Sequence, residues 1–346
     1  MSNNYKRTNV KEDTIEFTIT IPKENFKESY EAISKDKSKD LDLKGFRKGQ
    51  VPENMIKENL GDTIKFEVFE KLAPLYVNTS LTKEQIEPIA PPTYKEIPKL
   101  EVGEDIEFTV LVTIMPEFKL GNLKKIKVEK QEVKVTEEEI KNSLEELKKG
   151  QKTKEKEIND KWAKEVAKIL GLEKVEKLDE LKKLITDSLK AQKDHIALQG
   201  YQDKILKEAI ELSKIEIPEP AIKFEASERE KAFSYEMQQR GVDIKDFMKA
   251  QNLTIEKMRE MWEKDAKDAL ETDTLLKLFA TEKKVVVSDE ELGKKIEDIK
   301  KEKGDKENEI YSNPQWKEYI RNVETKQKAF QMLMTEVLGK DWNKKA

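Results

Sequence analysis

More than half of this 346-residue chain, from about residue 159 to its end, carries the periodicity of α-helices and little else. The expected helices cover residues 159–169, 178–213, 219–240, 244–250, 254–282, 288–303 and 313–338. Charged residues interrupt their apolar stripes, and no heptad pattern is sustained. These residues are therefore predicted to form an all-α domain, 159–346, whose helices pack in pairs as arms rather than as one bundle.

The composition supports extended helices with much solvated surface. Charged residues make up 40% of the chain and aromatic residues 7%, and the length favours two or three domains over one core. The formal net charge of −4 argues against a general polyanion-binding tail. No cysteine is present, which excludes disulfides, thiol catalysis and cysteine-ligated zinc. With no apolar signal-peptide core and no run long enough for a membrane, a soluble, cytoplasmic protein is expected.

Strand patterns occur only in residues 1–115. In "TIEFTITI" and "DIEFTVLVTI", apolar residues alternate with polar or smaller ones, which is typical of half-buried strands. Between them, a helix is expected after Pro22, a second from Pro52 to a C-terminal cap at Gly61, and a third over 62–82. The proline-rich stretch "EPIAPPTYKEIPKL" predicts an extended connection. Residues 1–115 are thus predicted to be a small α+β domain.

Residues 116–158 are interpreted as a linker. "KKIKVEKQEVKVT" alternates weakly and predicts an extended strand. A helix follows, with Thr136 as N-cap, Glu139 completing a capping box and Gly150 at its end. The next residues, "QKTKEKE", are polar and show no structural pattern. The chain therefore changes here from an α+β domain to an all-α domain through a short connection.

The sequence offers little for catalysis. The one histidine, His195, lies on a polar helix with no serine–acid pair or second metal ligand at helical spacing, and is interpreted as a surface residue. The 12 glycines form no phosphate-binding loop. Acidic pairs such as Glu138–Glu139 lie among lysines and are interpreted as solvated helix faces. No enzyme, cofactor or metal site is predicted.

One loop places an aromatic side chain among cations. "KGFRKGQVP" holds Phe46 between Lys44, Arg47 and Lys48, with Gly45 and Gly49 on each side. The glycines permit a sharp excursion, so an exposed tip could dock into a pocket with acidic or phosphate groups. The alternative is that Phe46 folds back into the core while the cations are solvated. The residues by themselves favour docking only slightly.

Six of the nine methionines fall in the helical part. They are Met237, Met248, Met258, Met261, Met332 and Met334. Methionine is flexible and polarizable, and it recurs on surfaces that accept many partners. Helical spacing such as Met258 to Met261 fits a core stripe equally well, so these residues are candidates for client binding with packing as the alternative.

The motif "GFRKGQVP" resembles the signature of the trigger factor family of ribosome-associated bacterial chaperones. The strand "TIEFTITIP", the "APPTY" segment, the "VEKQEVKVTEEEI" connector and "IEIPEPAI" are also similar to that family. The resemblance implies a multidomain α+β fold. It would comprise a small N-terminal α+β ribosome-binding domain, an extended linker and an all-α C-terminal domain with helical arms.

One departure from the family is large. Most members carry a peptidyl-prolyl isomerase domain of the FK506-binding type after the linker, whereas here only "QKTKEKE" occupies the junction, at about 150–158. Isomerase activity is therefore not expected.

The resemblance implies that Phe46, Arg47 and Lys48 contact a ribosomal protein and rRNA beside the exit tunnel. The arms and N-terminal domain would hold nascent and unfolded polypeptides in a cradle, without ATP and without a membrane. Two alternatives stay open. One is a ribosome-independent holdase or assembly chaperone that forms a homodimer off the ribosome, and the other is a prolyl isomerase with an unrecognised site.

Overall fold

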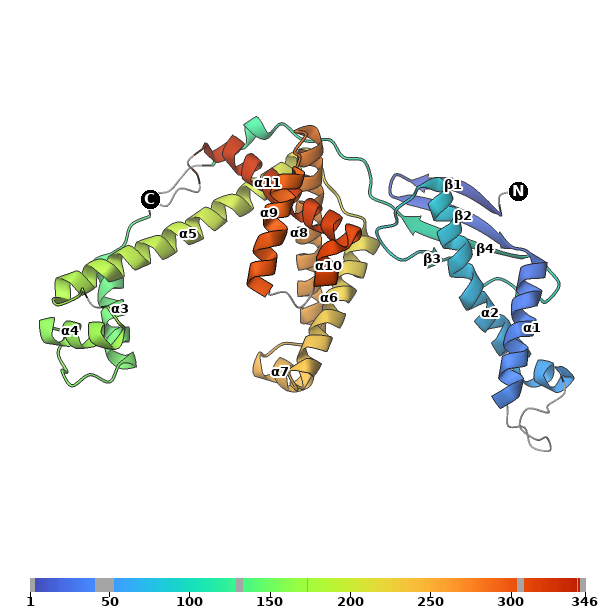
Figure 1. The fold of residues 1–346 in the computed structure, drawn as a ribbon, viewed down its shortest axis with the longest axis horizontal. Helices are drawn as coiled ribbons and strands as arrows, with labels where there is room; N and C mark the ends of the chain where they lie inside the picture. The colour runs from blue at the N-terminus through green and yellow to red at the C-terminus, as the bar shows by residue number, and fades with distance from the viewer. Residues whose placement is uncertain are drawn as a thin grey trace. The chain divides into compact units, whose positions relative to one another are not determined.

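The computed structural model describes residues 4–40, 53–128, 133–172, 174–303, 308–340 and 342. The chain forms two compact units, and each unit combines two stretches that are separate in the sequence. One unit contains Met1–Phe118 with Glu216–Glu271, and the other contains Lys119–Ile215 with Thr272–Ala346. Figure 1 labels the elements of both units.

The N-terminal part of the first unit is built on a four-stranded antiparallel sheet. Its strands are β1 (Tyr5–Lys11), β2 (Thr14–Ile21), β3 (Thr93–Tyr94) and β4 (Ile106–Thr113), in the order β1-β2-β4-β3. Strands β2 and β4 confirm the two alternating patterns, since Phe17 lies opposite Val110 and both are buried. The sequence did not predict β1, whose side chains are nearly all exposed and carry no apolar alternation.

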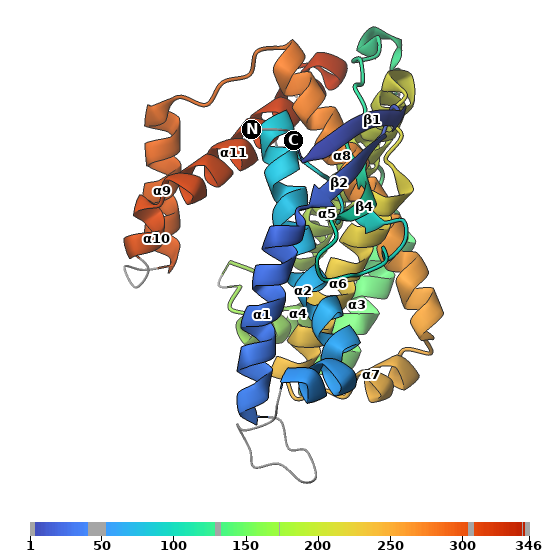
Figure 2. The same ribbon diagram turned by 90° about the vertical axis from the view of Figure 1, so that its right-hand side faces the viewer.

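Two helices cover one face of this sheet. They are α1 (Lys23–Asp40) and α2 (Glu53–Glu84), which lie side by side in Figures 1 and 2. Helix α1 follows Pro22, as predicted, and it buries Phe26 and Tyr30. The core between helices and sheet is formed by buried apolar residues, among them Ile15, Phe17, Ile19, Phe26, Ile64, Val68, Phe69, Phe108 and Val110.

Helix α2 corrects one expectation. Two helices divided at Gly61 were predicted, whereas α2 runs without a break from Glu53 to Glu84 and includes Pro74. The prediction was wrong because Gly61 is buried at the contact with α1 rather than exposed at a helix end. A Cβ atom at position 61 would lie 3.7 Å from the Tyr30 hydroxyl of α1, an ordinary contact distance, which places Gly61 on the side of α2 that faces α1.

The first unit also contains α6 (Glu219–Gln239), α7 (Ile244–Ala250) and the first part of α8 (Ile255–Glu282). Ring contacts join these three helices: the Phe233 ring centroid lies 5.5 Å from that of Phe247 and 5.6 Å from that of Trp262. A two-pronged ion pair between Arg259 and Glu230 adds a second link between α6 and α8. Residues 219–271 thus form an antiparallel structure that is called the α6–α8 hairpin below.

In the second unit, three helices surround a small core. They are α3 (Glu137–Gly150), α4 (Asp160–Ile169) and α5 (Leu178–Ser213). Trp162 is fully buried at the centre, against residues that include Ile140, Leu144, Val166 and Leu181. The capping box of Thr136 and Glu139 forms as predicted, and Lys193 of α5 also bonds Glu139. The Lys193 hydrogen bond and the Thr136 backbone N–H lower the pKa of the Glu139 carboxyl.

The C-terminal helices form a further cluster in the same unit. They are α9 (Asp289–Lys303), α10 (Asn308–Ser312) and α11 (Pro314–Leu338), and Figure 2 shows α9 and α10 against one end of α11. Their shared buried residues are Val287, Leu292, Ile296, Tyr311 and Ile320. Arg321 of α11 donates to the Val287 carbonyl at 2.6 Å and to Asp289 at 2.7 Å, which holds the start of α9 against α11.

The predicted helix boundaries of 159–346 agree with the observed ones to within one residue. The predicted strand over 124–136 is wrong for the part that the structure describes, because residues 124–128 and 133–136 belong to no sheet. A 3₁₀ turn, η1 (Leu123–Lys125), begins this stretch instead. Within the described ranges, no helix is long and apolar enough to cross a membrane.

The linker is fixed to the second unit at Gly121. Its N–H donates to the Ser213 hydroxyl at 2.9 Å, and Ser213 is buried at the end of α5. A Cβ atom at position 121 would lie 2.5 Å from the backbone carbonyl of Leu212, a distance that real Cβ atoms do not adopt. Only glycine therefore allows the linker to pass this closely over α5.

We expect Gly121→Ala to destabilise the second unit by about 1–3 kcal/mol, because the added methyl group forces the linker away from α5. Gly200→Ala is the matched control: Gly200 lies within α5, and a Cβ there meets nothing within 4 Å. Alanine should stabilise that helix by up to about 1 kcal/mol. Urea unfolding followed by circular dichroism measures both, and equal midpoints for Gly121→Ala and the unmodified protein would contradict the close passage.

Candidate functional site

The predicted docking residues lie outside the residues that the structure describes. They are Lys44, Gly45, Phe46, Arg47, Lys48 and Gly49. The described helices on each side, α1 and α2, pack along each other, and Lys37 near the end of α1 forms an ion pair of 2.9 Å with Glu67 of α2. The motif therefore connects two helices that are anchored in the N-terminal core.

The six candidate methionines do not form one site. Met237, Met258 and Met334 are buried, whereas Met248, Met261 and Met332 reach solvent to different degrees. The side chain of Met261 is 54% exposed on α8, and that of Met332 is 40% exposed on α11 in the other unit. Burial thus assigns three of the six to packing and leaves the other three available to a partner.

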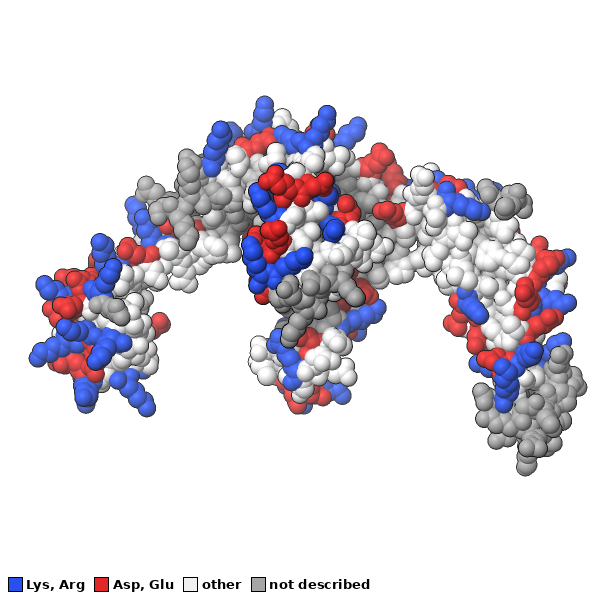
Figure 3. Space-filling model, in the orientation of Figure 1, with Lys and Arg blue, Asp and Glu red and all other residues white. Residues whose placement is uncertain are grey.

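The α6–α8 hairpin exposes large apolar side chains. They lie within two residues, along the sequence, of the contacting rings of Phe233 and Trp262. Tyr235, two residues from Phe233, is 64% exposed, and Met261 is adjacent to Trp262. Figure 3 shows uncharged surface around α7 that is interrupted by single charged side chains. The half-buried rings of Phe233, Phe247 and Trp262 contact one another across the three helices, whereas Tyr235 and Met261 are mostly exposed and contribute little to this packing.

A second uncharged surface lies on α2. Residues 72–82, "LAPLYVNTSLT", contain no charged side chain, although charged residues make up 40% of the chain. The corresponding face is pale in Figure 3, and Leu75 is 56% exposed. Sequence analysis missed this surface; the signal that could have found it is the long uncharged run within a helix of a highly charged protein.

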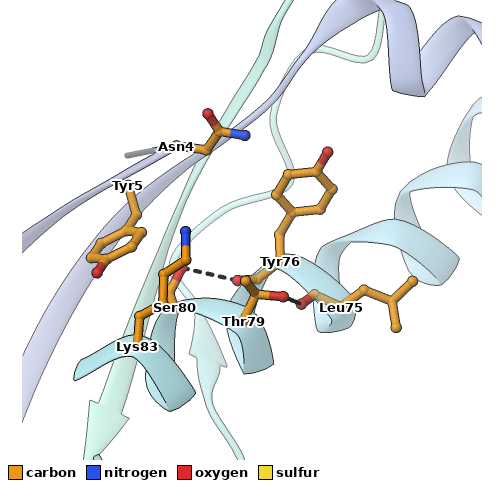
Figure 4. Close-up of a pocket in the computed structure, with 7 residues that line it drawn as sticks. All are labelled: Asn4, Tyr5, Leu75, Tyr76, Thr79, Ser80 and Lys83. Carbon is orange, nitrogen blue, oxygen red and sulfur yellow. Dashed lines mark hydrogen bonds between the residues drawn. The ribbon is translucent and has the colours of Figure 1, made fainter. Parts of the chain in front are cut away.

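A small cavity of about 230 Å³ opens between this face of α2 and the start of β1. It is lined by Asn4, Tyr5, Leu75, Tyr76, Thr79, Ser80 and Lys83, which Figure 4 shows as side chains. Tyr5 is held in place by Glu84, which accepts from its hydroxyl at 2.7 Å and from Arg7 at 2.9 Å. These hydrogen bonds from Tyr5 and Arg7 lower the pKa of the Glu84 carboxyl.

The junction between α3 and α4 is a closed loop. The Glu165 carboxylate of α4 accepts from the backbone N–H of Lys154 at 2.9 Å and from that of Glu155 at 3.2 Å. These two backbone donors lower the pKa of Glu165, the Lys154 N–H having the larger effect. The polar segment that was predicted to be without structure is therefore tied to α4, although it forms no helix or strand.

The described residues contain no group of three or more acidic or histidine side chains placed to hold a metal ion. His195 is exposed on α5, in agreement with its interpretation as a surface residue.

Comparison with known proteins gives consistent matches along the chain. The family model described as bacterial trigger factor protein matches residues 3–147, and the model of the trigger factor C-terminus matches residues 177–335. A trigger factor of Staphylococcus epidermidis is 23% identical over 81% of this chain and 85% of its own length. A trigger factor of Aliivibrio fischeri is 33% identical, over 34% of this chain and 27% of its own length.

A solved trigger factor structure has the same fold. It superimposes with a TM-score of 0.55 at 18% identity and covers 96% of this chain and 99% of that one. That trigger factor chaperone is described as recognising substrates promiscuously in folding and assembly. Together, the two family models cover most of the chain, including both the sheet domain and the helical region. The chain therefore belongs to the trigger factor family.

Proposed function

We propose that this protein is an ATP-independent chaperone that docks at the ribosome and holds unfolded polypeptides as they emerge, in the cytoplasm. The observation that carries the proposal is the match of both family models to one chain whose described surface exposes uncharged patches on two separate elements. Weak, dispersed apolar contacts can hold many sequences without selecting one. Such contacts delay the aggregation of chains that expose apolar segments before they fold.

Docking is assigned to residues 44–49, which lie between α1 and α2 in the sequence. Phe46 would insert into a pocket of a ribosomal protein, while Arg47 and Lys48 would contact acidic or phosphate groups of the protein and rRNA. Lys44 adds a further cation, and Gly45 and Gly49 permit the excursion of the chain. The ion pair between Lys37 and Glu67 supports this assignment because it joins the two helices that flank the motif in the sequence.

Replacing Phe46, Arg47 and Lys48 together with alanine should reduce co-sedimentation with ribosomes by about 100-fold or more, since an aromatic anchor and two cations are lost. The matched control is Lys182→Ala, Lys183→Ala and Leu184→Ala on α5, which removes the same charge and an exposed apolar side chain. The control should bind ribosomes normally, and both variants should keep their circular dichroism. Undiminished binding of the loop variant would show that docking occurs elsewhere.

Client holding is assigned in part to the α6–α8 hairpin. The exposed residues Tyr235 and Met261 offer apolar surface on a structure whose helices are joined by the half-buried rings of Phe233, Phe247 and Trp262. Met248 directly follows Phe247 on α7 and is half-buried. Met332 on α11 offers a further exposed methionine for client contact. Methionine adapts its shape to different partners, which fits a surface with many clients.

Changing Tyr235 and Met261 together to glutamate should raise the protein concentration needed to suppress aggregation of an unfolded model client by about threefold to tenfold, because apolar contact area is replaced by charge. Light scattering during dilution of the client from denaturant measures this. Gln239→Glu with Gln251→Glu adds the same charge at exposed polar positions and should have no effect. Equal loss in both variants would mean that net charge, and not this apolar surface, controls holding.

We also propose that the protein is not a prolyl isomerase. Only residues 148–176 separate the two family matches, and their described part forms the closed α3–α4 loop and α4, which leaves no room for a further domain there. Adding the protein to a proline-containing peptide should therefore leave cis/trans exchange at its uncatalysed rate, with times of about tens to hundreds of seconds. A concentration-dependent acceleration, measured by exchange spectroscopy, would contradict this.

A further inference from the structure

Strand β1 is a free edge of the sheet. It pairs with β2 on one side, and no strand of the described residues pairs with its other side. The Thr20 N–H donates to the Asn4 carbonyl at 2.8 Å, so the backbone groups of Asn4 point toward β2. Lys6 and Thr8 lie two and four residues after Asn4, and their backbone groups point toward β2 as well. Since alternate residues of a strand direct their backbone groups to opposite sides, Tyr5, Arg7 and Asn9 direct theirs away from β2. A row of such groups is a template for another extended chain.

The cavity described above lies beside this edge, on the helix-covered side. Tyr5 lies opposite Ile19 and Arg7 opposite Phe17, so their side chains share the side of the sheet that faces α2. Tyr5 forms one wall of the cavity, and Leu75, Tyr76 and Thr79 of α2 form the other (Figure 4). A strand added to β1 would therefore direct every second side chain toward the cavity.

The cavity is mainly apolar, and the hydroxyl groups on its α2 wall already have hydrogen-bond partners. The Thr79 hydroxyl donates to the Leu75 carbonyl at 2.7 Å, and the Ser80 hydroxyl to the Tyr76 carbonyl at 2.9 Å, as drawn in Figure 4. The Tyr76 hydroxyl accepts from Asn25 at 2.6 Å. At about 230 Å³ the space is smaller than the 300–1,000 Å³ typical of small-molecule sites, so it suits one bulky apolar side chain.

We propose that the edge of β1 and this cavity bind an extended polypeptide segment by antiparallel strand addition. The segment's backbone pairs with Tyr5, Arg7 and Asn9, and one apolar side chain enters the cavity beside Leu75. The inference rests on the proposed function, since unfolded clients supply segments with free backbone groups and exposed apolar side chains. Lys83 at the cavity and Lys6 and Lys11 on β1 favour segments with acidic residues beside the apolar one.

The charges of β1 argue against a second copy of this chain as the occupant. Antiparallel pairing of two β1 strands centred on Arg7 would place each Arg7 opposite the other, with Lys6 and Lys11 adding further like charge. Like charges directly opposite each other destabilise a strand pair. An unfolded client has no such restriction, because it can present whichever segment fits.

The test uses the full-length protein and a fluorescent synthetic peptide of alternating leucine and threonine with aspartate at both ends. In an antiparallel pair, residues opposite Tyr5, Arg7 and Asn9 place their side chains on the cavity side and their N–H groups toward β1. Methylation of the leucine amides should therefore weaken binding roughly tenfold or more, because hydrogen bonds to β1 are lost. Methylation of the threonine amides, which point away, should leave the affinity within about twofold.

Two pairs of variants separate the edge from the cavity. Asn9→Pro removes one outward N–H, which an edge strand tolerates, and should weaken the peptide by roughly tenfold, whereas Asn9→Ala retains the N–H and should not. Leu75→Lys should weaken peptide binding by a similar factor, because it places a charge in the cavity. Leu184→Lys, at an exposed leucine of α5, should leave peptide binding unchanged. Circular dichroism confirms that each variant is folded.

Amide hydrogen exchange by nuclear magnetic resonance gives a direct readout. Binding should slow exchange at Tyr5, Arg7 and Asn9 and leave Lys6 and Thr8 unchanged, since the latter two already face β2. Equal affinity for both methylated peptides, or no slowing at the three outward amides, would overturn the proposal. Slowing that depends on protein concentration without peptide would identify a second copy as the occupant and would also overturn it.

The aggregation measurement keeps the two proposals distinct. If the unmodified protein suppresses aggregation but the outward amides of β1 do not respond to peptide, strand addition is wrong and the chaperone function stands. If it does not suppress aggregation, the proposed function itself fails.

Discussion

The structure depends on a shortage of apolar side chains. Charged residues make up 40% of the chain and apolar residues 36%, so the chain cannot fill one large core. The apolar residues are instead gathered into small clusters: one between the sheet and α1–α2, one around Trp162, and one between α9 and α11. Each cluster is enough to fix a few elements. The remaining helix surface is solvated and carries ion pairs, such as Lys295 with Glu324, that contribute little individually.

On such a highly charged chain, exposed apolar side chains are an informative exception. Leu75 on α2 and Tyr235 on α6 are exposed although a charged residue at either position would suit a solvated helix better. Neither belongs to a buried cluster, and the helices that carry them are secured by other residues, such as Val68 and Phe233. The scaffold therefore separates the residues that hold it together from the apolar residues that remain exposed to solvent.

The sequence predicted the elements whose periodicity is strong. Strands β2 and β4 bury every second residue, and α5 begins and ends where its pattern does. Strand β1 was not predicted because it is held as a strand by its pairing with β2, and its own side chains are nearly all exposed. The break expected at Gly61 was wrong because glycine also occurs within helices, and the burial of Gly61 against Tyr30 of α1 depends on tertiary packing that the local sequence does not show. For the candidate surfaces, residue type identified methionines, but burial depends on tertiary neighbours, and so Met334 and Met261 could not be told apart.

The loop at residues 151–158 has a consequence for the modularity of the family. Glu165 closes the loop through backbone groups of Lys154 and Glu155, while Trp162 and its neighbours form a core to which Ile158 is the only contributor from this segment. Both helices that the loop joins, α3 and α4, contribute to that core independently of the loop's length. Lengthening a closed surface loop costs little entropy, which grows only with the logarithm of its length. This loop is therefore a position at which a folded domain can be inserted or deleted during evolution. The helices on either side, α3 and α4, keep their packing because it does not depend on the loop.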